Sequence, residues 1–326
     1  MNSFWSTIVF LIQQMWFFSI PLLIVALGGM FSERSGVVNI ALEGIMIVGA
    51  FCSIFFISNM QAKTSLNGQP LLILAILVAI VSGMVFSLLH AYAAINLRSD
   101  QTISGTALNM FAPAFAIYMA RTLQSNNVQQ VQFQNTTFYI EKVPVLGDIP
   151  VIGPLFFQNA YITTYLGILI LIVAAFVLYK TRFGLRLRSC GEHPQAADSV
   201  GINVYKIRYA GVMISGALAG LGGLVFVVPT STNFNASVSG YGFLALAVLI
   251  FGQWKPMRIF FAALFFGLMK TIASAYSGIP FLKALPIPSD IYKMTPYIAT
   301  LIVLAFTSKN SQSPRASGVP YDRGGR

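Results

Sequence analysis

An asparagine and a glutamate four residues apart are the first chemically capable groups in this chain. Asn39 and Glu43 lie in "SGVVNIALEGIMIVG", which is otherwise apolar. On a helix, residues at i and i+4 share one face, so this amide and this carboxyl point the same way. Polar groups inside a membrane are costly. The pair therefore predicts either an interhelical hydrogen-bond clamp, with Arg34 as a candidate partner of Glu43, or a direct role in solute binding or gating.

Two more polar residues interrupt apolar runs. Asn109 lies in "SGTALNMFAPAFA", which also holds Pro113. Bent or broken spans often frame transport sites, because freed backbone groups are tolerated only against protein or water. A plain proline kink is the alternative. His90 is expected to bond to a neighbouring helix, with a proton relay as the alternative.

The stretch "PTSTNFNASVSGYGF" at 229–243 is uncharged, polar and aromatic. Nucleobases stack on aromatic faces, with about 1–3 kcal/mol per base in single-strand binders. The candidates for a solute path are therefore Phe234, Tyr241 and Phe243 with Asn233 and Asn235, and an aromatic belt at the membrane interface is the alternative. An uncharged path suits a neutral nucleoside or sugar and not a phosphorylated solute.

A compact charged segment, 181–203, separates two long apolar runs. In "TRFGLRLRSCGEHPQAADSVGIN", Pro194 suits a helix start and Gly201 a helix end, which predicts a short helix over 194–200. A structured, basic element of this kind indicates a handle for a cytoplasmic partner. A loop that only sets topology is the alternative.

Catalytic and metal chemistry are not expected. The phosphate-binding pattern G-x-x-x-x-G-K-[ST] is absent, because the chain has no Gly-Lys dipeptide. His193 has no Ser or Asp partner nearby for a triad, and Cys52 and Cys190 are too few for a metal site. We therefore expect no cofactor in this chain, and any ATP-driven work must come from another chain.

The elements that position these groups are membrane helices. The chain of 326 residues is 56% hydrophobic and only 9% charged, against about 25% charged residues in soluble domains. Runs of roughly 20 apolar residues span a bilayer. The predicted fold is an all-α, polytopic transmembrane bundle with about nine spans, eight to ten. The spans are placed near 8–30, 37–58, 70–95, 101–123, 161–180, 207–228, 238–254, 259–275 and 291–307.

Charge placement predicts the orientation. If 181–206 is cytoplasmic, 14 of the 20 Lys and Arg residues lie inside, as the positive-inside rule requires. The N-terminus is then outside and the C-terminus cytoplasmic, and the net charge of +11 needs no nucleic-acid partner. The membrane domain is expected over 1–307, with 124–160 as an extracytoplasmic segment and 308–326 as a disordered cytoplasmic tail.

Two sequence patterns concern helix packing. The stretches 35–49 and 239–253 share Ser, Gly, Ala and Leu in one register and enter the membrane from opposite sides. This is typical of an inverted repeat, with chance similarity as the alternative. Gly216 and Gly220 form a G-x-x-x-G, which lets helices approach closely, either within the chain or with a second subunit.

Three stretches resemble a known family. "FSERSGVVNIALEGIMIVGAF", "GLRLRSCGEHPQAADSVGINVYKIRYAGVMISGALAGLGG" and "GFLALAVLIFGQWKP" are similar to permease subunits of bacterial ABC importers. More narrowly, they resemble the nucleoside-type branch of the family that includes ribose and branched-chain amino-acid permeases. The resemblance covers nearly the whole membrane domain and fades in 124–160 and in the tail.

The resemblance implies a coupling loop at 181–206. Its short helix would sit in a groove of a cytosolic ATPase, which binds ATP and Mg. By position, the residues implied in this contact are Gly184, Leu185, Arg186, Glu192, His193, Pro194 and Ala197.

The expected function is nucleoside uptake by alternating access in a bacterial cell membrane. The implied partners are a second permease, similar or identical, the cytosolic ABC ATPase, an extracytoplasmic substrate-binding lipoprotein and membrane lipid. Simple sugars are the alternative cargo. A proton-coupled secondary transporter using Glu43 and His90, and an intramembrane enzyme, are the rival classes.

Overall fold

The protein is a helical bundle in the computed structural model, which describes residues 3–64, 67–124, 127–276, 288–307 and 313–322. Within these residues, seven helices are long and apolar enough to cross a membrane, and the prediction of a polytopic bundle is confirmed. Two more helices of the described part of the chain pack in the bundle, namely α9 (Tyr241–Phe251), which is only 11 residues long, and α12 (Ser289–Thr307). The seven are α1 (Ser3–Arg34), α2 (Leu42–Lys63), α3 (Gln69–Ile95), α4 (Gln101–Leu123), α5 (Ile162–Lys180), α8 (Val204–Thr230) and α10 (Pro256–Ala275).

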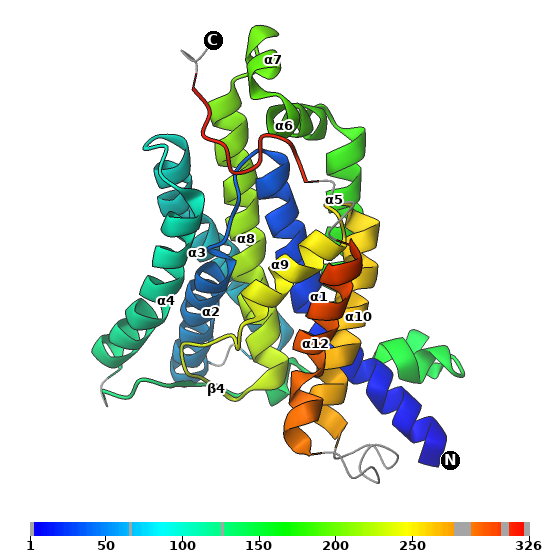
Figure 1. Ribbon diagram of the computed structural model, residues 1–326. Coiled ribbons are helices and arrows are strands. Elements are labelled where there is room, and N and C mark those ends of the chain that lie inside the picture. Colours follow the sequence, from blue (N-terminus) through cyan, green and yellow to red (C-terminus); the bar gives the residue numbers. More distant parts are fainter. Residues whose placement is uncertain (1–2, 65–66, 125–126, 277–287, 308–312, 323–326) are drawn as a thin grey trace.

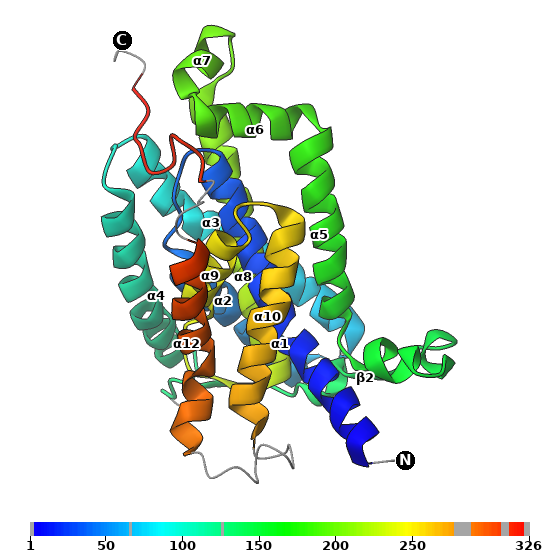
Figure 2. The same ribbon diagram turned by 45° about the vertical axis from the view of Figure 1, so that its right-hand side comes forward.

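The helices pack as two related sets. Helix α1 crosses α8 at the centre, and α8 is the most buried of the long helices. Helices α2 and α3 pack on α8 as α9 and α10 pack on α1, while α4 and α12 each flank their own set. Figures 1 and 2 show this arrangement. The contact pattern is that of an inverted repeat, in agreement with the sequence similarity of 35–49 and 239–253.

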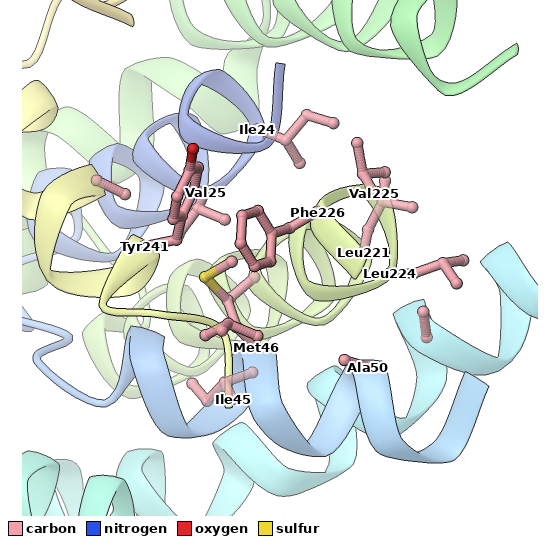
Figure 3. Packing of buried hydrophobic residues seen from close by; sticks show 14 of the residues in the cluster. Ile24, Val25, Ile45, Met46, Ala50, Leu221, Leu224, Val225, Phe226 and Tyr241 are labelled. Carbon is pink, nitrogen blue, oxygen red and sulfur yellow. The ribbon is translucent and has the colours of Figure 1, made fainter. Parts of the chain in front are cut away.

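Glycines on α8 allow this close packing. A Cβ added at Gly220 would collide with the backbone of Ala79 and Gly83, and one added at Gly223 with the Met46 carbonyl. The G-x-x-x-G of Gly216 and Gly220 therefore contacts α2 and α3 of the same chain, which decides between the two alternatives. The apolar side chains of α1, α2 and α8 fill the remaining space, as Figure 3 shows.

The two ends of the bundle differ. At one end, α5 turns into α6 (Arg182–Glu192), which leads to α7 (Pro194–Ser199) standing above the bundle (Figure 2). At the opposite end lie the short strands β1 (Val131–Gln132) and β4 (Asn233–Phe234), which pair with each other. The N- and C-termini lie at opposite ends of the bundle (Figure 1).

The segment 127–161 has little regular structure. Strands β2 (Ile140–Lys142) and β3 (Gln158–Ala160) form a second antiparallel pair. Between them and before them lie the short helical turns η1 (Thr136–Phe138), η2 (Leu146–Asp148) and η3 (Gly153–Phe157).

The expected disorder of the tail is wrong for residues 313–322, which we call the C-terminal strap. They cross the end of the bundle that carries α6 and α7 (Figure 1). The strap is rich in Ser, Pro and Gly, but Tyr321 is buried and Asp322 is paired with Arg98. Composition alone missed these contacts. The rest of the predicted tail, 308–312 and 323–326, lies outside the described residues.

Candidate functional site

The chain runs non-helically between α1 and α2, alongside α8. In this segment, 35–41, Asn39 Nδ2 donates to Ser215 Oγ at 2.9 Å. Since α8 begins at Val204 and rises about 1.5 Å per residue, Ser215 lies roughly 16 Å along it. Helix α2 therefore begins near the middle of the bundle. The predicted span 37–58 is in fact an irregular stretch followed by a helix.

Side chains from α3 and α4 satisfy the backbone of this segment. Gln101 Oε1 accepts from the Val38 N–H at 2.7 Å, and His90 Nε2 donates to the Val38 carbonyl at 2.8 Å. Asn109 Nδ2 donates to the Ile40 carbonyl at 2.8 Å. Irregular backbone at membrane depth persists only where its polar groups find such partners. These three side chains therefore make the break before α2 tolerable.

Asn109 also caps α2. Its Oδ1 accepts from the Gly44 N–H at 2.7 Å, in the first turn of the helix. First-turn N–H groups lack intrahelical partners, and an amide oxygen there stabilises the helix start. Pro113 lies in α4, the helix that carries Asn109. The two bonds of Asn109 to the start of α2 are specific contacts that a plain proline kink would not require.

Glu43 caps the short helix α9. Its two carboxyl oxygens accept from the Gly240 N–H at 2.9 Å and the Gly242 N–H at 2.6 Å, at the start of α9. A Cβ at Gly242 would collide with the Glu43 backbone, so the contact requires glycine there. A carboxylate is favoured at a helix N-terminus. The N-termini of two interrupted helices thus meet in one junction, the arrangement typical of transport sites.

The far end of α9 is tied to α1. Trp254 Nε1 donates to Glu33 Oε2 at 2.6 Å, and Arg34 Nη2 donates to the Trp254 carbonyl at 3.1 Å. The Arg34 guanidinium also lies 3.7 Å from the Glu192 carboxylate at the end of α6. A continuous set of polar contacts therefore runs from α6 through Arg34 to α9, and through α9 to Glu43.

The α6–α7 element has a defined shape. Helix α6 begins at the capping Thr181, whose Oγ1 accepts from the Gly184 N–H at 3.1 Å. Helix α7 ends before Gly201, whose φ is +81°. The Ile202 N–H bonds to the Ala197 carbonyl at 3.1 Å, which is the glycine-dependent helix stop expected from the sequence. The helix predicted over 194–200 is present as α7.

The C-terminal strap fastens this element to the bundle. The Ala316 N–H bonds to the Gly191 carbonyl at 2.8 Å, and Arg208 Nη1 donates to the Val319 carbonyl at 2.9 Å. Tyr321 packs in a buried cluster with Cys190, Ala197 and Val204. The strap therefore joins α6, α7 and α8.

Comparison with known proteins identifies the chain. Residues 11–305 match the family described as branched-chain amino acid transport system, permease component. The chain belongs to this permease family. The permease is 46% identical over 311 residues to the guanosine ABC transporter permease protein NupQ of Bacillus subtilis, covering 95% of each chain.

Two relatives come from Lactococcus lactis. The nucleoside ABC transporter permease protein NupC is 43% identical, covering 97% of the permease and 98% of NupC. The nucleoside ABC transporter permease protein NupB is 26% identical, and the match covers 93% of the permease and 83% of NupB. No solved structure matches the permease.

The structure of the permease overturns two expectations about its polar residues. Asn39 and Glu43 do not share a helix face, because Asn39 precedes α2 and faces α8 while Glu43 faces α9. Arg34 is not the partner of Glu43, since it contacts Trp254 and Glu192. The helical periodicity assumed over the whole stretch fails at the break before Leu42.

The aromatic candidates separate in the structure. Phe234 is only 2% exposed and pairs with Val131 in the β1–β4 ladder, so it packs inside the protein. Asn235 is exposed. Phe243 is half exposed and lines a hollow beside α9. These three residues do not form one surface.

The seven residues implied in ATPase coupling all lie on the α6–α7 element. Leu185, Arg186 and His193 are exposed, and so is Val200 directly after α7. Glu192 faces Arg34. The other three residues are buried within the α6–α7 element, namely Gly184, Pro194 and Ala197.

Three contributors were not predicted from the sequence. Glu33 and Trp254 fasten α1 to the end of α9, and Gln101 satisfies the backbone of 35–41. Glu33 follows a charge-free run and lies between the spans predicted at 8–30 and 37–58, so no contact was predicted for it. The pattern gave no signal for Gln101, because its role depends on a backbone segment that no periodicity reveals.

Removing the Tyr321 ring is expected to expose Cys190. Burial raises the pKa of the Cys190 thiol more than the nearby Arg208 lowers it, and the residue is fully buried. Only the thiolate reacts with maleimide. Loss of a buried aromatic ring costs about 3 kcal/mol or more, so Tyr321→Ala should raise Cys190 labelling at least tenfold in a Cys52→Ser background.

Arg98→Ala is the matched control. It breaks the Arg98–Asp322 pair of the same strap, which is half exposed, and solvent-exposed ion pairs contribute little to stability. Equal labelling of Cys190 in the Tyr321→Ala variant and the parent protein would show that the strap does not cover the α6–α7 element.

Proposed function

We propose that the permease carries nucleosides as the membrane-spanning subunit of an ATP-driven ABC importer. The observation that carries this proposal is the full-length similarity to two relatives named for guanosine and for nucleosides. The interrupted helices α2 and α9, capped by Asn109 and Glu43, support a transport role. Simple sugars remain the second cargo to be tested.

The proposed partners follow from the same relatives. A cytosolic ABC ATPase would bind ATP and Mg, and an extracytoplasmic lipoprotein would deliver the solute. Lactococcus lactis has two relatives of the permease, both named nucleoside permeases, and they differ in sequence. We therefore propose a pair of non-identical permeases in a bacterial cell membrane, with the N-terminus outside and the α6–α7 end in the cytoplasm.

The contacts support a route for coupling. The exposed surface of Leu185, Arg186 and His193 would rest on the ATPase. Movement of α6 would reach Arg34 through Glu192, and Arg34 would pass it to Trp254 and α9. Helix α9 in turn holds Glu43 by its N-terminus. The route connects the proposed ATPase contact to the junction of the interrupted helices.

Uptake by the complete importer in proteoliposomes tests the function. With both permeases, the ATPase and the lipoprotein present, we expect labelled nucleosides to accumulate only when ATP is supplied, and vanadate to stop the uptake. A permease that accumulates nucleosides alone, driven by a proton gradient, would instead support the secondary transporter. Accumulation of glucose without nucleosides would support the sugar alternative.

Charge reversal at Glu192 is expected to uncouple the importer. In Glu192→Lys, two cations would face each other at Arg34, so the contact between α6 and Arg34 would be lost and the route to α9 would be broken. We expect nucleoside taken up per ATP hydrolysed to fall about tenfold, with the complex still assembled. The measurement is uptake and ATPase activity in the same vesicles.

The exchanged pair Arg34→Glu with Glu192→Lys provides the control. It restores the opposite charges but not the Arg34 bond to the Trp254 carbonyl, so it should recover only part of the coupling. If Glu192→Lys transports as many nucleosides per ATP as the parent, the route through Arg34 is wrong.

A further inference from the structure

A cavity of about 510 Å³ lies between α9, α10 and α12, in the size range of small-molecule sites. A second hollow of about 360 Å³ shares Lys270 and Ser239 with it and reaches Gln14 and Thr230. Lys270 and Ser239 therefore stand where two hollows meet. The polar and aromatic residues of the larger cavity include Tyr241, Phe243, Lys270, Tyr297 and Thr300.

Lys270 is a cation within a membrane helix. Its ammonium lies 5.8 Å from the centre of the Tyr241 ring. Within the described residues, no carboxylate pairs with Lys270, and the Tyr241 ring is the only polar or aromatic group that its ammonium contacts. Ionisable residues inside a membrane are costly and mark pathways or ligand sites. Lys270 thus needs an explanation that packing does not give.

Two further features surround the same cavity. The Tyr241 hydroxyl is buried and has no hydrogen-bond partner in the described part of the chain, although its ring lies 4.1 Å from that of Phe226 (Figure 3). Ser239 has a φ of +54°, a strained conformation for a residue with a side chain. Strained residues cluster at ligand sites, and a buried polar group without a partner needs an explanation.

The related groove of the first repeat has a different lining. It lies between α2, α3 and α4, with a volume of about 710 Å³. Apart from Cys52 and Ser82, its lining is hydrocarbon, with residues such as Leu77 and Val81. Packing of the repeat therefore produces a groove without needing polar groups. Lys270 of α10 and Tyr241 of α9 line only the second of these two grooves.

We propose that this cavity binds the base of a nucleoside and that Lys270 selects bases that present a carbonyl oxygen. The inference rests on the proposed nucleoside cargo. An ammonium group only donates hydrogen bonds. A 6-oxopurine offers two acceptors, O6 and N7, on one edge, whereas adenine offers an amino donor beside N7. Phe243 and Tyr297 are more than half exposed and supply faces for stacking.

Inosine and adenosine provide the test, since they differ at the position that Lys270 would read. In proteoliposomes with the complete importer, we expect the ratio of inosine to adenosine uptake to be at least ten. Lys270→Met should lower that ratio about tenfold, and Lys270→Arg should keep most of it. Lys293→Met removes an exposed lysine that pairs with Asp290, so it should leave the ratio unchanged.

A second measurement does not depend on Lys270 variants. In a Cys52→Ser, Cys190→Ser background, the Tyr297→Cys variant should be labelled by maleimide, and inosine should slow this labelling more than adenosine. An unchanged uptake ratio in an active Lys270→Met importer, or labelling unaffected by inosine, overturns the inference while nucleoside uptake stands. A parent importer that takes up neither inosine nor adenosine overturns the proposed function itself.

Discussion

Gly220→Val is expected to prevent the bundle from assembling. A Cβ at Gly220 would meet the backbone of Ala79 and Gly83, and backbone atoms cannot move aside as a flexible side chain can. Gly49 of α2 approaches the same glycine from the other side. Helix α8 would have to move away from α3, against which it packs most extensively.

Overpacking costs typically 1–3 kcal/mol where side chains can adjust. Because this contact is between backbones, we expect at least about 3 kcal/mol, a thermal midpoint in detergent roughly 10 °C lower, and little folded permease after purification. Ala107→Val is the matched control, since Ala107 is exposed on α4. A Gly220→Val protein as stable as the control would show that α8 does not pack this closely.

Local patterns predicted the elements that depend on local chemistry. The apolar runs gave the long helices, and Pro194 and Gly201 gave α7 together with its glycine-dependent stop. The sequence similarity of two short stretches indicated the inverted repeat. The resemblance of "GLRLRSCGEHPQAADSVGIN" to permease coupling loops indicated which segment to place at the ATPase.

What the sequence did not predict depends on contacts between distant segments. The irregular backbone before α2 exists because His90, Gln101 and Asn109 satisfy it from other helices. The composition of this segment is that of a membrane span, so the sequence predicted a helix there. The C-terminal strap has the composition of a disordered tail, and contacts with distant residues hold it in place, among them the buried Tyr321 and the bonds to Gly191 and Arg208.

Glu43→Leu is expected to abolish uptake, with Glu43→Gln retaining a measurable part. In the leucine variant, the Gly240 and Gly242 N–H groups at the start of α9 lose both acceptors. Each unsatisfied buried donor costs about 1–3 kcal/mol, so the junction loses roughly 2–6 kcal/mol. Glutamine keeps one acceptor oxygen in nearly the same place and should preserve one of the two bonds.

The comparison separates the two roles left open for Glu43. If the carboxyl is a clamp between α2 and α9, uptake should follow the number of acceptors and rank parent, glutamine, leucine. If transport needs the negative charge itself, both variants should lose uptake equally while remaining folded. Glu141→Leu, in the exposed strand β2, is the control and should transport normally. We expect the ranked result, because both carboxyl oxygens of Glu43 are already engaged by the α9 backbone.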